Sequence, residues 1–285
     1  MPTDSSVRDA ATIMILREAA AGLEVFMVRR HSNSAFLANR YVYPGGKLDD
    51  HDCTEVAARH VEGLTPAMAK ERLGEQIEPL QALGLFYAGI RETFEEAGIL
   101  LARRGDQSGD ERALIDLTSD DYVARTFERY RAQLNAGEIA LSEVAEQENL
   151  VFPLDRLGYF AHWITPTAEP KRYDTRFFVA IAPDSQRPLH DARETTDSTW
   201  IRPADAVEQN QNGEFMLAPP TLRTLQKLAE FDSAKAAFDW SLEHHPPSIL
   251  PRMEQRDGRI WVTFTEEEGD VEMMAENVGL WRVVG

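Results

Sequence analysis

The sequence predicts an α+β fold, in which short strands and several helices share one core. Two apolar stretches at residues 11–16 and 24–30 have the composition of strands. Residues 85–98 carry apolar side chains at helical spacing. Strand-like stretches return at 176–183 and 198–203. Because long helix-favouring segments separate these strands, we expect helical insertions between the parts of one sheet.

Length and composition favour a single domain over residues 1–285. Hydrophobic residues make up 43% of the chain, enough for a sizeable core, and no repeat or linker divides it. The net charge of −18 argues against a nucleic-acid polymer as partner, because such proteins carry a basic surface. A small anionic ligand stays compatible with this charge, since a metal ion and a few arginines can supply a local positive field.

Cysteine content and hydropathy indicate the compartment. Cys53 is the only cysteine, which rules out an intramolecular disulfide. The first residues do not have the pattern of a secretion signal, and the apolar runs fall short of the roughly 20 residues that cross a bilayer. We therefore expect a cytoplasmic protein without membrane contact.

The first third of the chain predicts a hairpin, a turn and a helix. Residues 11–16 and 24–30 form the hairpin around the turn-like AAAGL, and a further strand at 41–43 ends at Pro44-Gly45-Gly46. Glycines at such a turn let a ligand approach the main chain closely. Thr65-Pro66 is typical of a helix start.

The helix at 85–98 has a core-facing stripe, and Gly98 is placed to end it. The stripe consists of Phe86, Ile90, Thr93, Phe94 and Ala97. After it we expect a strand at 99–102 and a mostly helical region at 106–160. Further on, a proline-started helix at 217–231 and a late strand at 258–265 are predicted.

Three carboxylates lie off that stripe at spacings of three and four: Glu92, Glu95 and Glu96. Like charges at these spacings destabilise a helix. One interpretation is a solvated acidic face. The other is a site for a divalent cation that offsets the repulsion.

Two segments together resemble the Nudix box, which reads Gly, five residues, Glu, seven residues, then Arg-Glu-apolar-x-Glu-Glu-x-Gly-apolar. RETFEEAGI (91–99) matches the second half except at Thr93, where an apolar residue is usual. YPGGKLDDHD (43–52) is similar to the first half if Gly46 is the box glycine, but Asp52 then stands in place of glutamate. The 38 residues 53–90 separate the halves, where the pattern has seven.

A split box of this kind resembles the Nudix motif-19 type of coenzyme A diphosphatase. The stretches VYPGGKLDD, WITPTAEPKRYDTRFFVA and LAPPTLRTLQKLAEF are also similar to that branch, so the resemblance covers about residues 11–265. An arginine signature that many coenzyme A-cleaving members carry is matched by Arg30, whereas Ala35 and Asn39 depart from it.

The resemblance implies a Nudix α/β/α sandwich with a mixed sheet and helical insertions at about 53–84 and 106–160. It implies a pyrophosphohydrolase that uses Mg²⁺ or Mn²⁺ and cleaves coenzyme A or acyl-CoA by attack of water. Another dinucleotide or nucleotide sugar, such as NADH or ADP-ribose, is the alternative substrate class. A non-catalytic nucleotide-binding protein is the alternative outside enzymes. A homodimer is compatible with the family.

The resemblance also assigns roles to residues. Glu95 and Glu96 are expected to bind the metal ion, and Glu92 to share that work or to position the water. Arg91 is expected to orient the glutamates, while Gly45, Gly46 and Arg30 contact metal or substrate. Asp52 is either the partner of Arg91 or a plain loop aspartate.

For Glu194 and for two arginines in the second half of the chain, the sequence leaves two interpretations each. Glu194 is either a further metal ligand or base, or a solvated loop acid. Arg172 and Arg176 are candidates for contacts with phosphate or for surface salt bridges.

Overall fold

The computed structural model describes most of the chain. The described residues are 7–31, 38–74, 76–105, 113–183, 185–186, 195–266, 269–277 and 280–284.

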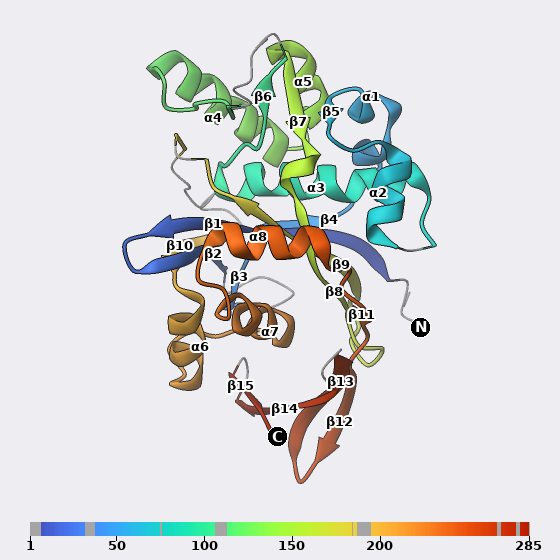
Figure 1. Cartoon of the computed structure of the whole chain (residues 1–285), viewed down its shortest axis with the longest axis vertical. Coiled ribbons are helices and arrows are strands. Elements are labelled where there is room, and N and C mark those ends of the chain that lie inside the picture. Colours follow the sequence, from blue (N-terminus) through green and yellow to red (C-terminus); the bar gives the residue numbers. More distant parts are fainter. Residues whose placement is uncertain are drawn as a thin grey trace.

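A mixed eight-stranded sheet lies at the centre of the molecule (Figure 1). Six strands follow the order β10-β2-β1-β9-β8-β11, with β1 antiparallel to β2 and parallel to β9. These strands are β1 (Arg8–Ala19), β2 (Gly22–Arg30), β8 (Gly158–Ile164), β9 (Tyr173–Ile181), β10 (Thr195–Ile201) and β11 (Ser248–Ile249). The predicted hairpin and the predicted mixed sheet are confirmed.

The β1–β2 hairpin opens into a fork that holds the glycine turn. Residues 16–19 of β1 pair with residues 22–25 of β2. Beyond this pairing, β3 (Tyr41–Val42) adds to β2, and β4 (Gly45–Lys47) adds to β1. The strand expected at 41–43 is therefore two short strands around Pro44. In this register Gly45 pairs with Thr12 and Gly46 with Ala11, which places both glycines within the sheet.

Helices cover both faces of the sheet, as an α/β/α sandwich requires (Figure 1). On one face lies α3 (Pro79–Ala97), where the rings of Phe86 and Phe178 have centroids 4.4 Å apart. On the opposite face lie α6 (Pro203–Gln211) and α7 (Pro219–Leu228). A further helix, α8 (Ala234–Glu243), packs against β8 and β9. No helix in the described part of the chain is both long and apolar enough to cross a membrane.

Helix α3 confirms the predicted stripe, all of whose members are at most 1% exposed. It begins at Pro79 rather than at residue 85, so residues 79–84 belong to this helix and not to the insertion. It ends at Gly98, whose φ of 68° lies in the left-handed region that favours glycine.

The strand expected at 99–102 is absent, and strand β6 begins only at Arg103 (Arg103–Arg104). At Leu100 a side chain, and not a neighbouring strand, forms the hydrogen bonds to the backbone. The Gln186 amide accepts a hydrogen bond from the Leu100 N–H at 2.8 Å and donates one to the Leu100 carbonyl at 3.0 Å. The segment is buried, but Gln186 satisfies the backbone of Leu100 in place of a paired strand.

The two insertions join into one subdomain on the outer side of α3 (Figure 1). The first holds α1 (Glu55–Ala58), β5 (Val61–Glu62) and α2 (Pro66–Leu73), and the second holds α4 (Asp121–Asn135), α5 (Leu141–Glu148) and β7 (Leu150–Pro153). Strand β7 pairs with both β5 and β6. The region 106–160 is thus less helical than predicted, because it also contains β7 and the start of β8.

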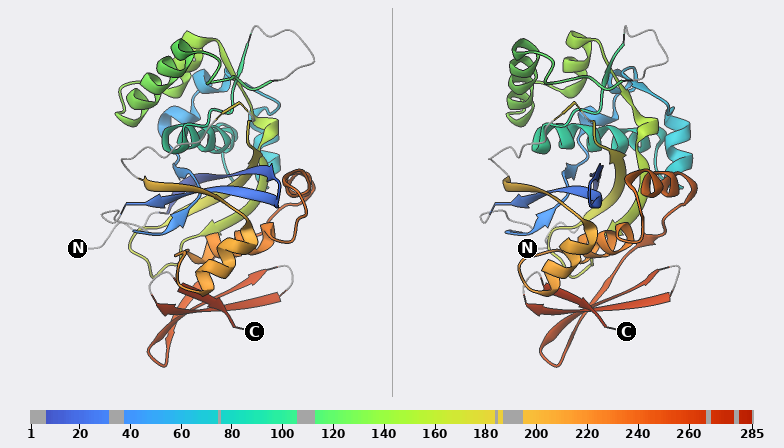
Figure 2. Two further views of the ribbon diagram at one scale, coloured as in Figure 1. Left: turned by 90° about the vertical axis from the view of Figure 1, so that its left-hand side faces the viewer. Right: turned by 60° about the vertical axis from the view of Figure 1, so that its left-hand side comes forward.

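A second sheet of four antiparallel strands follows α8. It consists of β12 (Arg252–Arg256), β13 (Arg259–Glu266), β14 (Gly269–Asn277) and β15 (Leu280–Val283). Figure 2 shows it on the far side of α6 from the insertions. Its core contacts the main sheet, since the rings of Phe264 and Trp163 have centroids 4.9 Å apart. Only β13 was predicted here, as the strand at 258–265.

Candidate active site

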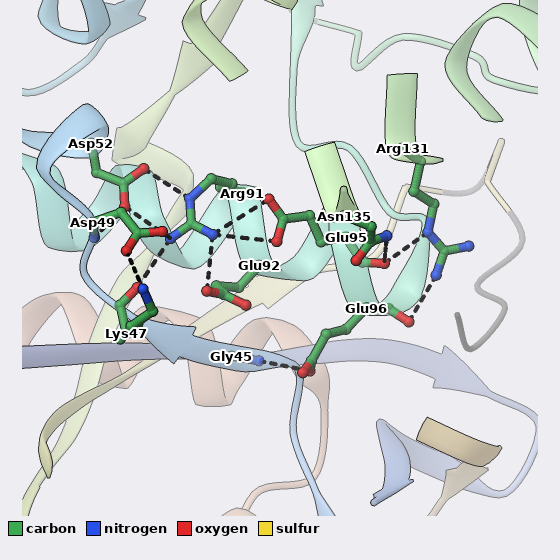
Figure 3. Close-up of polar contacts among 10 residues, drawn as sticks. All are labelled: Gly45, Lys47, Asp49, Asp52, Arg91, Glu92, Glu95, Glu96, Arg131 and Asn135. Atoms are coloured by element: carbon green, nitrogen blue, oxygen red, sulfur yellow. Dashed lines mark hydrogen bonds and ion pairs between the residues drawn. The ribbon is translucent and has the colours of Figure 1, made fainter. Parts of the chain in front are cut away.

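The three glutamates lie on the last turns of α3, next to the glycine strand β4 (Figure 3). Glu96 is 4% exposed and turns toward β4, where its Oε2 accepts a hydrogen bond from the Gly45 N–H at 3.1 Å. Glu92 and Glu95 turn instead toward Arg91 (Figure 3). The carboxylates are therefore partly buried groups with defined partners, and a solvated acidic face does not describe them.

Arg91 forms the centre of this arrangement. Its Nη1 donates to Glu92 Oε1 at 2.9 Å and lies 3.3 Å from Glu95 Oε2. Its Nη2 donates to the carbonyl of Lys47 at 3.0 Å. The guanidinium thus joins Glu92 and Glu95 of α3 to the end of β4.

Asp52 closes the split in the box. Its two oxygens accept hydrogen bonds from Arg91 Nε and Nη2, each at 2.9 Å, in the bidentate geometry that favours arginine and carboxylate. Asp52 is only 3% exposed and lies in the short 3₁₀ helix Asp50–Cys53, where it also accepts from the Asp49 N–H. The prediction that Asp52 pairs with Arg91 is confirmed, and the loop alternative is wrong.

The two glycines allow the close approach between β4 and its neighbours. A Cβ atom on Gly46 would lie 2.4 Å from Glu92 Oε1. One on Gly45 would lie 2.3 Å from Thr12 Oγ1 and 2.5 Å from the Ala11 carbonyl. Any side chain here would displace either a candidate metal ligand or the sheet itself.

Burial and crowding change the acidity of these groups. Burial raises the pKa of Glu92 to about 7; Arg91 opposes this rise and Glu95 adds to it. Burial also raises the pKa of Glu95, again against the effect of Arg91. Burial alone would lower the pKa of Arg91, but the hydrogen bond to Asp52 and the surrounding carboxylates raise it. One guanidinium therefore does not fully compensate the negative charge of the cluster.

The carboxylates of Glu92, Glu95 and Glu96 are chemically suited to bind a hard divalent cation. In this structure, however, their oxygens do not point toward a common centre. Among the described residues, no three His, Cys, Asp or Glu side chains converge as a ready metal site, because Glu96 is turned to Gly45 and the other two glutamates to Arg91. Carboxylate oxygens are the ligands that Mg²⁺ and Mn²⁺ prefer. A cation there would add positive charge to a cluster in which three carboxylates lie around the guanidinium of Arg91.

The other predicted site residues fall at different places. Arg30 ends β2, and its N–H donates to the carbonyl of Arg40 at 3.0 Å, so it lies at the open end of the fork that holds Gly45 and Gly46. Glu194 lies outside the described residues, just before β10.

Arg172 and Arg176, the two other candidates for phosphate contacts, bind residues of the protein itself. The Arg172 Nε donates to the carbonyl of Thr165 at 3.1 Å. Arg176 is 2% exposed and forms ion pairs with Asp9 and Asp174, so it is neither a surface bridge nor positioned for phosphate.

Two residues that the sequence did not suggest hold the end of α3. Arg131 of α4 donates from Nε to the Glu95 carbonyl at 2.9 Å and from Nη2 to the Glu96 carbonyl at 2.8 Å (Figure 3). Asn135 donates to the same Glu95 carbonyl at 3.2 Å. No sequence signal could have selected them, because α4 carries several arginines and only the fold decides which one reaches α3.

A cavity of about 600 Å³ opens beside β10 and is not part of this cluster. Tyr41 and Phe215 stack in its wall with ring centroids 3.8 Å apart. None of the three box glutamates lines it, and its walls carry the carboxylates of Glu24, Asp197, Asp205 and Glu214. The arginine of this lining, Arg202, pairs with Asp205, and the remaining carboxylates would repel a phosphate, so we place the candidate chemistry at the α3 cluster.

Comparison with known proteins gives a consistent picture. The family model described as the NUDT19 Nudix domain matches residues 6–228. A *Xenopus laevis* protein named acyl-coenzyme A diphosphatase NUDT19 is 24% identical over 73% of this chain and 60% of its own length. The *Gallus gallus* protein of the same name is 25% identical over 88% of this chain and 71% of its own. The chain thus spans less than two thirds of the length of the frog relative.

A solved structure supports the fold independently. A Nudix hydrolase from *Alicyclobacillus acidocaldarius* superposes with a TM-score of 0.66 at 28% identity, covering 82% of this chain and 96% of that one. The predicted sandwich is thereby confirmed at the level of the whole fold.

Proposed function

Because the chain belongs to the Nudix family of the NUDT19 domain type, we propose that it is a metal-dependent pyrophosphohydrolase acting on coenzyme A or an acyl-CoA. One observation carries this proposal. The Asp52–Arg91 pair joins the two halves of a split box beside Glu92 and Glu95, and the third glutamate accepts a hydrogen bond from Gly45 of the first half. The substrate class is supported by the relatives named acyl-coenzyme A diphosphatase.

The roles of the residues follow from their surroundings. Glu95 and Glu96 would hold Mg²⁺ or Mn²⁺, with the main chain of Gly45 and Gly46 beside them. The bound metal ion would neutralise charge on the bridging phosphates and activate water. Arg91 holds the glutamates in place and does not need to touch substrate.

Glu92 is our candidate for the proton acceptor. In the metal-free protein, burial raises the pKa of this carboxyl to about 7, which makes Glu92 a stronger base than an ordinary glutamate. As the water oxygen bonds to phosphorus, its proton passes to Glu92 and the bridging P–O bond breaks. Coenzyme A would give adenosine 3',5'-bisphosphate and a phosphopantetheine. Glu194 remains our second candidate for base or metal ligand, since the strand that follows it pairs with Arg30.

The proposal is tested by a substrate screen. Purified protein with Mg²⁺ or Mn²⁺ is incubated with coenzyme A, acyl-CoA, NADH, ADP-ribose and diadenosine polyphosphates, and products are separated by chromatography. We expect coenzyme A or acyl-CoA to be cleaved. Glu95→Gln should lose activity by at least about 100-fold, because a metal ligand is removed. Glu128→Gln, on the exposed face of α4, is the matched control.

Two outcomes would contradict different parts of it. If no substrate is turned over and wild type equals Glu95→Gln, the hydrolase proposal is wrong. If ADP-ribose is cleaved while coenzyme A stays intact, only the substrate class is wrong.

A cytoplasmic location and a homodimer are further parts of the proposal. The single, half-buried Cys53 is compatible with a reducing compartment. Light scattering of the purified protein would decide the oligomeric state, and a fluorescent fusion would decide the location.

A further inference from the structure

Arg40 differs from Arg91, Arg103 and Arg176 in having no carboxylate partner among the residues that the structure describes. Arg91, Arg103 and Arg176 each form an ion pair with a carboxylate. Arg40 is half-buried, and within the described part of the chain its guanidinium has no ion pair. Its Nε is fully buried and has no hydrogen-bond partner.

The charged groups around Arg40 do not fully compensate the positive charge of its guanidinium. Burial lowers its pKa, and Glu169 only partly opposes this effect. Leaving a buried donor of a charged group unpaired costs free energy. An anion that accepted a hydrogen bond from Nε would recover this free energy, and guanidinium groups suit phosphate in both shape and charge.

The position of Arg40 relates it to the candidate active site. It directly precedes β3, and the short run from residue 40 to Gly45 spans at most about 18 Å. Arg30 lies beside it, since the Arg30 N–H donates to the Arg40 carbonyl. In a chain with a net charge of −18, two arginines are thus adjacent at the open end of the fork whose other arm carries Gly45 and Gly46. A ligand could reach both places while presenting different groups to each.

We propose that Arg40, with Arg30 beside it, forms a second anion subsite that binds a phosphate monoester of the substrate outside the pyrophosphate that is cleaved. The inference rests on the proposed function, within which this group is the 3'-phosphate of coenzyme A. The subsite would separate coenzyme A from nucleotides that lack a third phosphate, such as ADP-ribose and NADH.

Kinetics with paired substrates test the subsite. Wild type, Arg40→Gln and Arg40→Lys are compared on coenzyme A and 3'-dephospho-coenzyme A. We expect Arg40→Gln to lose about tenfold or more in kcat/KM on coenzyme A, mainly through KM, and little on the dephospho substrate. Arg40→Lys should keep part of the preference, because it retains the charge. Arg125→Gln, whose side chain is 80% exposed on α4, should change neither substrate.

A binding experiment makes the subsite testable without turnover. Adenosine 3',5'-bisphosphate and AMP are titrated into each protein by calorimetry. The bisphosphate should bind wild type about tenfold more tightly than AMP, and Arg40→Gln should remove this ratio. An equal loss for both substrates or both nucleotides, or no loss for either, would overturn the subsite. Absence of turnover with the binding ratio intact would instead count against the proposed hydrolase alone.

Discussion

Helix α3 is held at two points by different chemistry, once by Asp52 just before the first insertion and once by α4 of the second insertion. The first insertion follows directly after Asp52, whose carboxylate forms a buried ion pair with Arg91 in the middle of α3. The second insertion contributes Arg131 and Asn135, which donate hydrogen bonds to main-chain carbonyls at the C-terminal end of α3. The Glu92–Glu96 segment lies between these attachments. The second insertion therefore supports the site, and the box tolerates its split because one ion pair restores the contact.

The two attachments differ in which groups are left without a partner when the contact is removed. Asp52 and Arg91 are 3% and 7% exposed, so loss of either side chain leaves buried hydrogen-bonding groups of the other, which is charged, without their bidentate partner. The last carbonyls of a helix are acceptors that water or another donor can satisfy. We therefore expect the first attachment to dominate stability and the second to adjust the geometry of Glu95 and Glu96.

The largest effect is expected from Asp52→Ala. It should lower the free energy of unfolding by about 3–5 kcal/mol, because it leaves Arg91 buried without its bidentate partner. Urea denaturation followed by circular dichroism measures this. Asp50→Ala, an exposed neighbour in the same 3₁₀ helix, is the control. If the two variants unfold within about 1 kcal/mol of each other, the split box is not held by this pair.

The ion pair also shows which parts of the site the sequence could predict. Helix α3 was predictable because its apolar stripe and Gly98 are local signals, and the box pattern selected Arg91 and the glutamates. The partner of Arg91 was predictable only as an alternative. Spacing alone cannot show that a chain returns to Asp52 after residues 53–90, whereas the folded structure brings the two groups within 2.9 Å.

Other features had no local signal at all. The β5–β7 pairing that joins the two insertions links segments about 90 residues apart, and each strand is too short to give a periodic pattern. The strand expected at 99–102 failed for a related reason, since a distant side chain, Gln186, satisfies the backbone of Leu100. Arg131 and Asn135 are surface-type residues on a charged helix until the fold places them against α3.

A pH-dependent effect on stability is expected from Glu92, which contacts Arg91 of the first attachment. The pKa of Glu92 rises from its ordinary value of 4.5 to about 7 on folding, so the folded state binds more protons between these values. Without metal, this group should therefore make the protein lose up to about 3 kcal/mol of stability as the pH rises from 4.5 to 7. Urea denaturation at several pH values, with and without Mg²⁺, measures the slope.

Two comparisons decide whether Glu92 is responsible. Glu92→Gln should flatten the slope, because the amide does not titrate. Mg²⁺ should stabilise wild type more at pH 7 than at pH 5, since it binds the ionised carboxylates. An unchanged slope in Glu92→Gln would show that other groups control the pH dependence.

The smallest effect on stability is expected at the second attachment. Arg131→Met removes two hydrogen bonds to carbonyls and a positive charge at a helix C-terminus, which together should cost about 1–2 kcal/mol of unfolding free energy. Its effect on metal should be more specific. Because the two carbonyls belong to Glu95 and Glu96, looser backbone there should weaken Mn²⁺ binding by about threefold to tenfold. Urea denaturation and Mn²⁺ titration followed by electron paramagnetic resonance measure the two effects separately.

A control on the same helix separates positioning from general stability. Arg125→Met, which removes an exposed arginine of α4, should leave both quantities unchanged. Asn135→Ala should act in the same direction as Arg131→Met but more weakly, because it removes a single hydrogen bond of 3.2 Å to Glu95. If Arg131→Met lowers stability while Mn²⁺ affinity stays at the wild-type value, the second insertion only stabilises the helix and does not position its metal ligands.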